Sequence, residues 1–182
     1  VLFSKHVHAR ILSIDTSSAE ALDGVVLVLT ARDVPVNEYG LIYNDQPVLC
    51  GPGSDKEGTD IVRFEGDQVA LVVAESAEIA EKALSLITVD YEDLPIVKTL
   101  ADALKENATL LHPGRSSNIF HHNIIRHGNV EEAFKSCDVI VEGEYQTPVQ
   151  EHAYLQPEAG VAFLDDEGRI TVVVGGQWTH ED

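Results

Sequence analysis

Gln68-Val-Ala-Leu-Val-Val-Ala74 and the residues that follow it decide the fold class of the first half of this 182-residue chain. The run is apolar and rich in valine, which predicts a β-strand. Ser76 predicts a helix N-cap, with Glu78 in the first turn and apolar residues recurring between Ile79 and Leu84. Ile87-Thr-Val-Asp-Tyr91 predicts another strand, so the stretch has a strand–helix–strand pattern.

The same rhythm extends to both sides of this stretch. Upstream lie a predicted strand from Ala9 to Ile14, a short helix capped within Asp15 to Ser18, and a buried strand from Val25 to Leu29. Ile61-Val-Arg-Phe64 precedes the central strand by one Gly66 turn, which predicts a hairpin. Proline and glycine punctuate residues 30–58, a long loop of a kind that is often functional or lies against a partner. With a helix from Thr99 to Lys105, residues 1–106 are predicted to form a compact α/β domain.

The second half begins after a linker predicted at residues 107–117, which contain Pro113, Gly114 and two serines and lack periodicity. Residues 118–182 are then expected to form a second, incomplete α+β domain. Its predicted elements are an extended stretch from Ile119 to Arg126, a helix from Val130 to Ser136, a strand from Val139 to Tyr145, and a hairpin of Ala159 to Leu164 with Arg169 to Val174.

Charge and cysteine content exclude several classes of function. The formal net charge is −19, from 31 acidic and 12 basic residues, and such a surface repels nucleic acid and anionic lipid. The longest apolar runs have strand length, which excludes a membrane span. Cys50 and Cys137 are far apart, so a local iron–sulfur or zinc-ribbon site is excluded and two reduced thiols in a cytoplasmic protein are favoured over a disulfide.

The two ends of the chain favour a segment cut from a longer protein. The sequence begins at Val1 without methionine, contains no methionine, and stops at Asp182 directly after a predicted strand. We therefore expect that the chain alone is not a complete enzyme.

Eight histidines raise the alternative of a metal-dependent hydrolase. His6 and His8 would share one face of a strand, as two zinc ligands do, and His121, His122 and His127 lie close in sequence. However, the H-E-x-x-H pattern is absent, and Glu151-His152 lacks the second histidine of a helical site. Surface or hydrogen-bonding roles are favoured for these histidines, and no metal ligand is assigned. There is no G-x-S-x-G motif and no activating context for either cysteine, which disfavours nucleophilic hydrolysis.

Gly175-Gly176-Gln177 follows an apolar strand directly. Two glycines permit another molecule to approach the backbone closely, and the amide of Gln177 can both donate and accept a hydrogen bond. By spacing alone an ordinary strand-end turn is favoured over a binding site, and both interpretations stay open at this point.

Taken together, the motifs of the chain resemble those of the aldehyde oxidase and xanthine dehydrogenase family. In the family's order they are His8-Ala-Arg-Ile11 with Ser13-Ile-Asp15, Leu22-Asp-Gly-Val25, Leu29-Thr-Ala-Arg-Asp-Val-Pro35, Gly66-Asp-Gln-Val-Ala-Leu-Val-Val-Ala-Glu-Ser76, Val89-Asp-Tyr-Glu-Asp-Leu-Pro95, Gly128-Asn-Val-Glu-Glu-Ala-Phe134, Val141-Glu-Gly-Glu-Tyr145, Gln150-Glu-His-Ala-Tyr-Leu-Gln-Pro-Glu158 and Gly176-Gln177. Each motif alone is weak, but nine in one order across nearly the whole chain form a specific pattern.

The resemblance implies a fold and an activity. Residues 1–106 would form a hammerhead domain of mixed strands and helices, and residues 118–182 the first strands of the molybdopterin-binding domain, an α/β (α+β) organisation. Members of the family hydroxylate a purine-like N-heterocycle or an aldehyde with water as the oxygen source. They use molybdenum bound to a molybdopterin dinucleotide, and the electrons leave through iron–sulfur clusters, commonly to FAD.

The resemblance also implies partners and site residues. An iron–sulfur subunit, an FAD-binding subunit and a small-molecule substrate are expected, in a cytoplasmic hetero-oligomer. Gln177, next to Gly176, matches the family's glutamine that hydrogen-bonds a ligand of the molybdenum. The family's glycine-rich cofactor motif and catalytic base lie downstream of this segment, so no catalytic residue is assigned here.

Two departures and one rival accompany the resemblance. Asn129 stands where the family usually has Asp, which changes only a helix cap, since Asn caps about as well as Asp. Gln156 stands where Glu is common, a change that bears on partner or substrate preference. The rival from another class is a non-catalytic binding or assembly module that uses the hammerhead fold.

Overall fold

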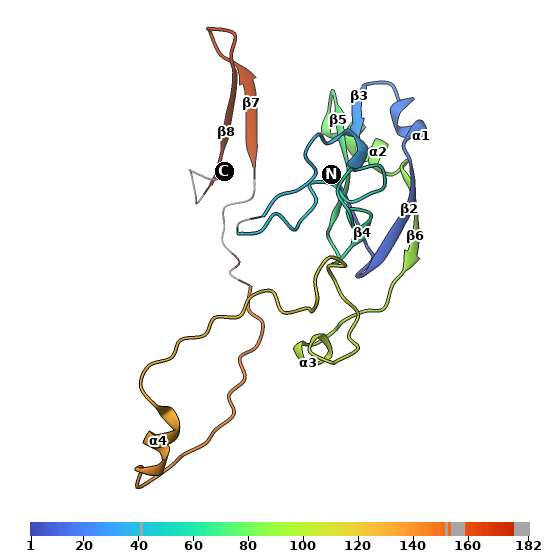
Figure 1. Cartoon of the computed structure of the whole chain (residues 1–182). Coiled ribbons are helices and arrows are strands. Elements are labelled where there is room, and N and C mark those ends of the chain that lie inside the picture. The colour runs from blue at the N-terminus through green and yellow to red at the C-terminus, as the bar shows by residue number, and fades with distance from the viewer. Residues whose placement is uncertain (41, 152, 154–158, 177–182) are drawn as a thin grey trace. The chain divides into compact units, whose positions relative to one another are not determined.

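The protein is described by a computed structural model that covers residues 1–182 except 41, 152, 154–158 and 177–182 (Figure 1). The chain forms two compact units, Val1–Asn123 and Ile124–Asp182. Each unit is considered by itself below.

Two three-stranded antiparallel sheets make up the framework of the first unit. The first sheet has the order β1-β5-β3, and the second has the order β4-β2-β6. The strands are β1 (Leu2–Phe3), β2 (Ala9–Asp15), β3 (Val25–Leu29), β4 (Ile61–Val62), β5 (Gln68–Ala74) and β6 (Thr88–Asp93). The mixture of strands and helices confirms the predicted fold class.

Four short helices complete this unit, namely α1 (Ser17–Glu20), the 3-10 helix η1 (Ala31–Asp33), α2 (Ala77–Leu84) and α3 (Leu100–Ala103). Ser76 caps α2 as predicted, because its Oγ accepts a hydrogen bond from Ile79 N at 3.3 Å. Thr99 caps α3 in the same way, with Oγ1 accepting from Asp102 N at 3.0 Å. Both helices therefore begin where local side-chain chemistry satisfies free amide groups.

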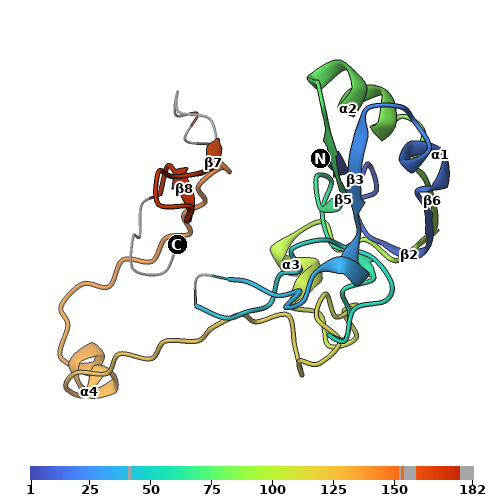
Figure 2. The same cartoon turned by 90° about the horizontal axis from the view of Figure 1, so that it is seen from above.

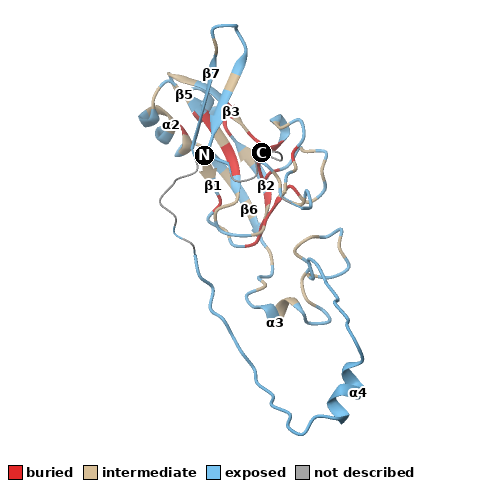
Figure 3. Ribbon diagram, turned by 90° about the vertical axis from the view of Figure 1, so that its left-hand side faces the viewer, coloured by how far each residue is buried: buried red, intermediate tan, exposed pale blue. Residues whose placement is uncertain are grey.

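Two apolar clusters hold the first unit together. In the first, Ile11 of β2 packs with Val62 of β4 and Val69 of β5, and thereby joins the two sheets. In the second, Val28 of β3 and Val72 of β5 pack against α1 and α2. Figure 2 shows α2 beside the β3–β5 pair, and Figure 3 shows the buried residues gathered on the strands of this unit. Because β5 contributes to both clusters, it is the central element of the core.

The hairpin predicted from Ile61 to Ala74 is wrong. β4 pairs with β2, whereas β5 pairs with β1 and β3. The reason lies in the turn, where the Asp67 carboxylate accepts hydrogen bonds from the amides of Arg63 at 2.6 Å and Phe64 at 3.3 Å. A side chain thus takes the amides that a hairpin ladder would use, and the chain leaves one sheet for the other.

The prediction that β3 is a buried strand is also wrong in part. Val28 is buried, but Val26 and Leu27 are 68% and 47% exposed. The strand lies at the edge of its sheet, so one of its sides has no neighbouring strand among the described residues. An apolar run therefore predicted strand formation correctly and burial incorrectly, since burial depends on what packs against the strand.

The second unit contains α4 (Val130–Lys135) and the antiparallel hairpin of β7 (Gly160–Leu164) and β8 (Ile170–Val174), all as predicted. Asn129 caps α4, with Oδ1 accepting from Glu132 N at 3.3 Å. The strand predicted at Val139 to Tyr145 is wrong, because these residues pair with no strand in the described part of the chain. These residues are exposed, as the pale blue ribbon after α4 shows in Figure 3. An extended segment becomes a strand only when a partner takes its amide and carbonyl groups.

Both cysteines are free thiols, with Cys50 buried in the first unit and Cys137 exposed in the second. Burial raises the pKa of Cys50 to about 12, which makes its thiolate unfavourable at neutral pH. No helix in the described ranges combines the length and the apolar character that a bilayer crossing requires.

Candidate functional site

The glycine pair after β8 is the part of the predicted cofactor site that the structure describes. β8 pairs with β7 from Gly160 opposite Val174 to Leu164 opposite Ile170, and the strand ends directly before Gly175. Both Gly175 and Gly176 are exposed. Gln177, the residue predicted to hydrogen-bond a molybdenum ligand, lies outside the described residues, as does Gln156.

The exposed strand end fits a cofactor that approaches the main chain. Neither glycine has a Cβ atom, so a bulky group can approach these peptide groups without meeting a side chain of residue 175 or 176. The described residues contain no group of three or more His, Cys, Asp or Glu side chains that could hold a metal ion.

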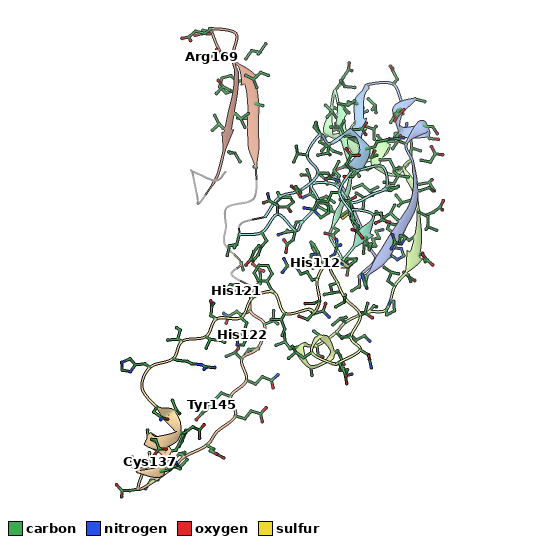
Figure 4. The ribbon with its side chains drawn as sticks, in the orientation of Figure 1. His112, His121, His122, Cys137, Tyr145 and Arg169 are labelled. Carbon is green, nitrogen blue, oxygen red and sulfur yellow. The ribbon has the colours of Figure 1, made fainter. Side chains whose placement is uncertain are left out.

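His6 and His8, which the sequence placed as a pair of possible zinc ligands, have other partners. His6 Nδ1 lies 2.8 Å from Asp93 Oδ1, and its ring stacks on Tyr91 with 4.1 Å between centroids. The Nδ1 of buried His8 lies 2.7 Å from the carbonyl oxygen of Pro95. These contacts link the segment that precedes β2 to β6 and to the chain that follows β6, which is a structural role. His121 and His122 lie on the extended stretch labelled in Figure 4.

The first unit contains two adjoining cavities of about 260 and 290 Å³ beside the long loop. Five residues line both of them, namely Asp45, Gln46, Pro47, Arg63 and His112. Asn37 links two parts of the loop, because its Oδ1 accepts hydrogen bonds from Val48 N at 2.8 Å and from Leu49 N at 3.0 Å. The loop between β3 and β4 is therefore ordered by its own polar side chains.

The cations of these cavities are already neutralised or bonded. Lys56 forms an ion pair with Glu38, and its Nζ donates to Asn44 O at 2.6 Å. Arg115 lies 3.7 Å from Asp45 and over the rings of Tyr43 and Phe120. Arg63 donates to main-chain carbonyls, as detailed below. The cavities thus offer no uncommitted cation among the described residues to bind an anion.

His112, labelled in Figure 4, is a residue of these cavities whose pKa is shifted by its surroundings. Burial lowers its pKa most, and the charge of Arg63 lowers it further; Asp45 raises the pKa by less than Arg63 lowers it, and Arg115 makes the smallest, lowering contribution. The imidazole is therefore neutral near pH 7, and the cluster disfavours its protonation. Sequence reasoning missed Arg63 and His112. The signal that was available for Arg63 is an arginine within the apolar run from Ile61 to Phe64, three residues before Gly66-Asp67.

We predict that this cluster makes the chain less stable in acid. Because the pKa of His112 is lower in the folded than in the unfolded chain, the unfolded chain binds the proton more readily. The stabilising contribution of His112 to the free energy of unfolding is complete above about pH 6.5, and it is lost as the pH falls below that value. His112→Gln should flatten the pH dependence of the free energy of unfolding between about pH 5 and 7. Denaturant titrations at each pH, with the exposed His122→Gln as the control, measure this slope. An equal slope in wild type and His112→Gln would contradict the prediction.

Comparison with known proteins places the chain in a family. The family model "Aldehyde oxidase and xanthine dehydrogenase, a/b hammerhead domain" matches residues 1–95, and the model "Molybdopterin cofactor-binding domain" matches residues 111–182. A mixed α+β fold followed by a glycine-ended strand is thus that of a hammerhead domain joined to a molybdopterin-binding region. The chain belongs to the aldehyde oxidase and xanthine dehydrogenase family.

Individual relatives agree with this assignment. The chain is 42% identical over 183 residues to a probable xanthine dehydrogenase subunit of Bacillus subtilis, covering 100% of this chain and 23% of that protein. It is 39% identical over 176 residues to the nicotinate dehydrogenase large molybdopterin subunit of Eubacterium barkeri, covering 96% of this chain and 39% of that protein. The solved aldehyde oxidoreductase of Desulfovibrio gigas matches with a TM-score of 0.76 at 30% identity, over 95% of this chain and 19% of that one. The chain therefore spans well under half the length of these relatives.

Proposed function

We propose that the chain is part of the large molybdenum-cofactor subunit of an oxidoreductase. In this proposal the complete subunit hydroxylates an N-heterocycle, with a purine-like compound as the first candidate, or an aldehyde, and takes the oxygen from water. The observation that carries the proposal is the order of the two family regions, hammerhead at residues 1–95 and molybdopterin-binding at 111–182, in one chain. The names of two relatives, a xanthine and a nicotinate dehydrogenase, support an N-heterocycle as substrate.

Gly176 and Gln177 are the residues of this chain that we assign to the cofactor. The exposed Gly175-Gly176 pair leaves the main chain after β8 open to close approach. The Gln177 side-chain amide would donate a hydrogen bond to a ligand of the metal and so fix the orientation of that ligand. The molybdenum centre, when bound, supplies the redox chemistry, and the protein supplies binding, orientation and electrostatics. The base that would accept a proton is expected outside this segment.

The proposal also includes partners. An iron–sulfur subunit or domain and an FAD-binding subunit or domain would carry the electrons away, in a cytoplasmic hetero-oligomer. The relatives from Bacillus subtilis and Eubacterium barkeri are each named as a subunit, which supports an assembly. The domain division into residues 1–106, a linker at 107–117, and 118–182 remains part of this proposal.

The deciding experiment is element analysis of the full-length subunit purified together with its co-purifying partners. We expect about one molybdenum per large subunit, iron in the partner fraction, and no molybdenum when the host cannot make molybdopterin. A folded full-length subunit that holds no molybdenum in a cofactor-competent host would contradict the proposal and favour the non-catalytic binding module.

A further inference from the structure

Arg63, directly after β4, joins two parts of the first unit that lie far apart in sequence, through three main-chain carbonyl groups. Its Nε donates to Leu111 O at 2.6 Å, one guanidinium nitrogen donates to Gly58 O at 3.0 Å, and the other donates to Ile61 O at 3.1 Å. Two of these acceptors are local, but Leu111 is 48 residues further along the chain. A single side chain thus holds a distant segment against the loop that precedes β4.

Asn118 forms hydrogen bonds to the same segment around Leu111. Its Oδ1 accepts from Leu111 N at 3.0 Å, and its Nδ2 donates to Thr109 O at 2.9 Å and to Ala103 O at 3.3 Å. The peptide groups of Leu111 are therefore fixed on both sides, the carbonyl by Arg63 and the amide by Asn118. The contact with Ala103 connects this arrangement to α3.

A third contact lies between these two. Arg115 is 3.7 Å from Asp45 of the long loop, and its guanidinium lies 5.3 Å from the ring centre of Tyr43 and 5.5 Å from that of Phe120. The two rings meet edge to face at 5.1 Å. Residues 107–118 therefore contact β4, α3 and the long loop, although their sequence has the composition of a linker.

The chemistry of the Arg63 contact explains why it holds firmly. A guanidinium presents several N–H donors in one rigid plane, whereas a lysine ammonium is a single point on a flexible stem. Hydrogen bonds from a charged donor stabilise more than neutral ones do, and Arg63 is half-buried, where water competes less for the carbonyl groups. Lysine at this position keeps the charge but cannot reach three carbonyl oxygens in three directions.

We propose that Arg63 and Asn118 are positioning residues that lock residues 107–118 onto the first unit as a fixed strap. The chain would then leave the hammerhead domain from one defined point instead of through a flexible linker. A further consequence rests on the proposed function: an unlocked strap would lower cofactor loading, because the region that matches the molybdopterin-binding domain, residues 111–182, begins within the strap.

Hydrogen–deuterium exchange on the full-length subunit with its partners tests the strap. Arg63→Lys and Asn118→Ala should each raise amide exchange in peptides covering residues 109–117 about tenfold, while peptides covering β5 stay as in wild type. Arg32→Lys is the matched control, since Arg32 is an exposed arginine of the same unit whose side chain makes no hydrogen bond or ion pair within the described residues. Molybdenum content is measured on the same samples.

The outcomes separate the strap from the function. Faster exchange confined to residues 109–117 in both variants supports the strap, and wild-type exchange in both overturns it. If Arg63→Lys also loosens β5, the unit itself has opened, and Asn118→Ala then decides by the same criterion. Lower molybdenum in both variants than in wild type supports the effect on loading, and unchanged molybdenum overturns that effect. A wild-type subunit without molybdenum refutes the proposed function, while the exchange data still judge the strap.

Discussion

Gln177→Ala in the full-length subunit should lower kcat/KM about 10- to 100-fold, with molybdenum content and the fold retained. The expectation rests on the proposed role of the Gln177 amide, which donates a hydrogen bond to a ligand of the metal. Groups of this kind orient what binds the metal directly, and their loss costs activity more than it costs folding. Steady-state kinetics and element analysis on the same preparation measure both quantities.

A second glutamine of the same region serves as the control for this experiment. Gln146 lies in the exposed, extended part of the second unit, and Gln146→Ala should leave kcat/KM close to the wild-type value. Wild-type kcat/KM in Gln177→Ala would remove Gln177 from the cofactor site. Gln177→Glu is informative as well, because it keeps the length of the side chain and loses the N–H donor.

Ile11→Ala should destabilise the first unit more than other single truncations in its core. Ile11 is 2% exposed and packs between the two sheets with Val62 and Val69. Replacing a buried isoleucine by alanine removes apolar contacts and leaves a cavity, at a cost of about 2–5 kcal/mol in the free energy of unfolding. Chemical denaturation of the chain measures this change in the free energy of unfolding, provided that unfolding is monitored with a signal that arises from the first unit.

Val26→Ala is the matched control for Ile11→Ala. Val26 is also an aliphatic strand residue but is 68% exposed on β3, so its truncation should change the free energy of unfolding by less than about 0.5 kcal/mol. Equal losses in the two variants would show that the packing between the sheets does not hold this unit together.

Whether a structural prediction was correct depended mainly on how far apart in sequence the interacting residues lie. The helix at Ser76, the cap at Asn129 and the hairpin of β7 and β8 were predicted correctly, because each is specified by residues only a few positions apart. The hairpin at Ile61 to Ala74 failed although it is also local. There the Asp67 carboxylate competes for two amide groups, and no hydrophobic pattern reports such competition.

The candidate site shows the same division. The order of the motifs predicted the family. The family resemblance, and not the spacing, selected Gly176 and Gln177, whose role stays a prediction. Arg63 and His112 were not predicted as a pair, since 49 positions separate them and only folding brings both to the same cavities. Residues 107–118 have a linker's composition, yet the hydrogen bonds of Arg63 and Asn118 hold them on the first unit.

The sequence by itself therefore determined the class of fold, the helices that begin after Ser76 and Asn129, the hairpin of β7 and β8, and membership of the family. These properties follow from side-chain patterns within a few residues and from motifs in a fixed order. Only the tertiary structure decided which strands pair, which apolar runs are buried, and that Arg63 reaches Leu111. Strand pairing and burial depend on partners distant in sequence, and hydrogen-bond geometry selects those partners only when the chain is folded.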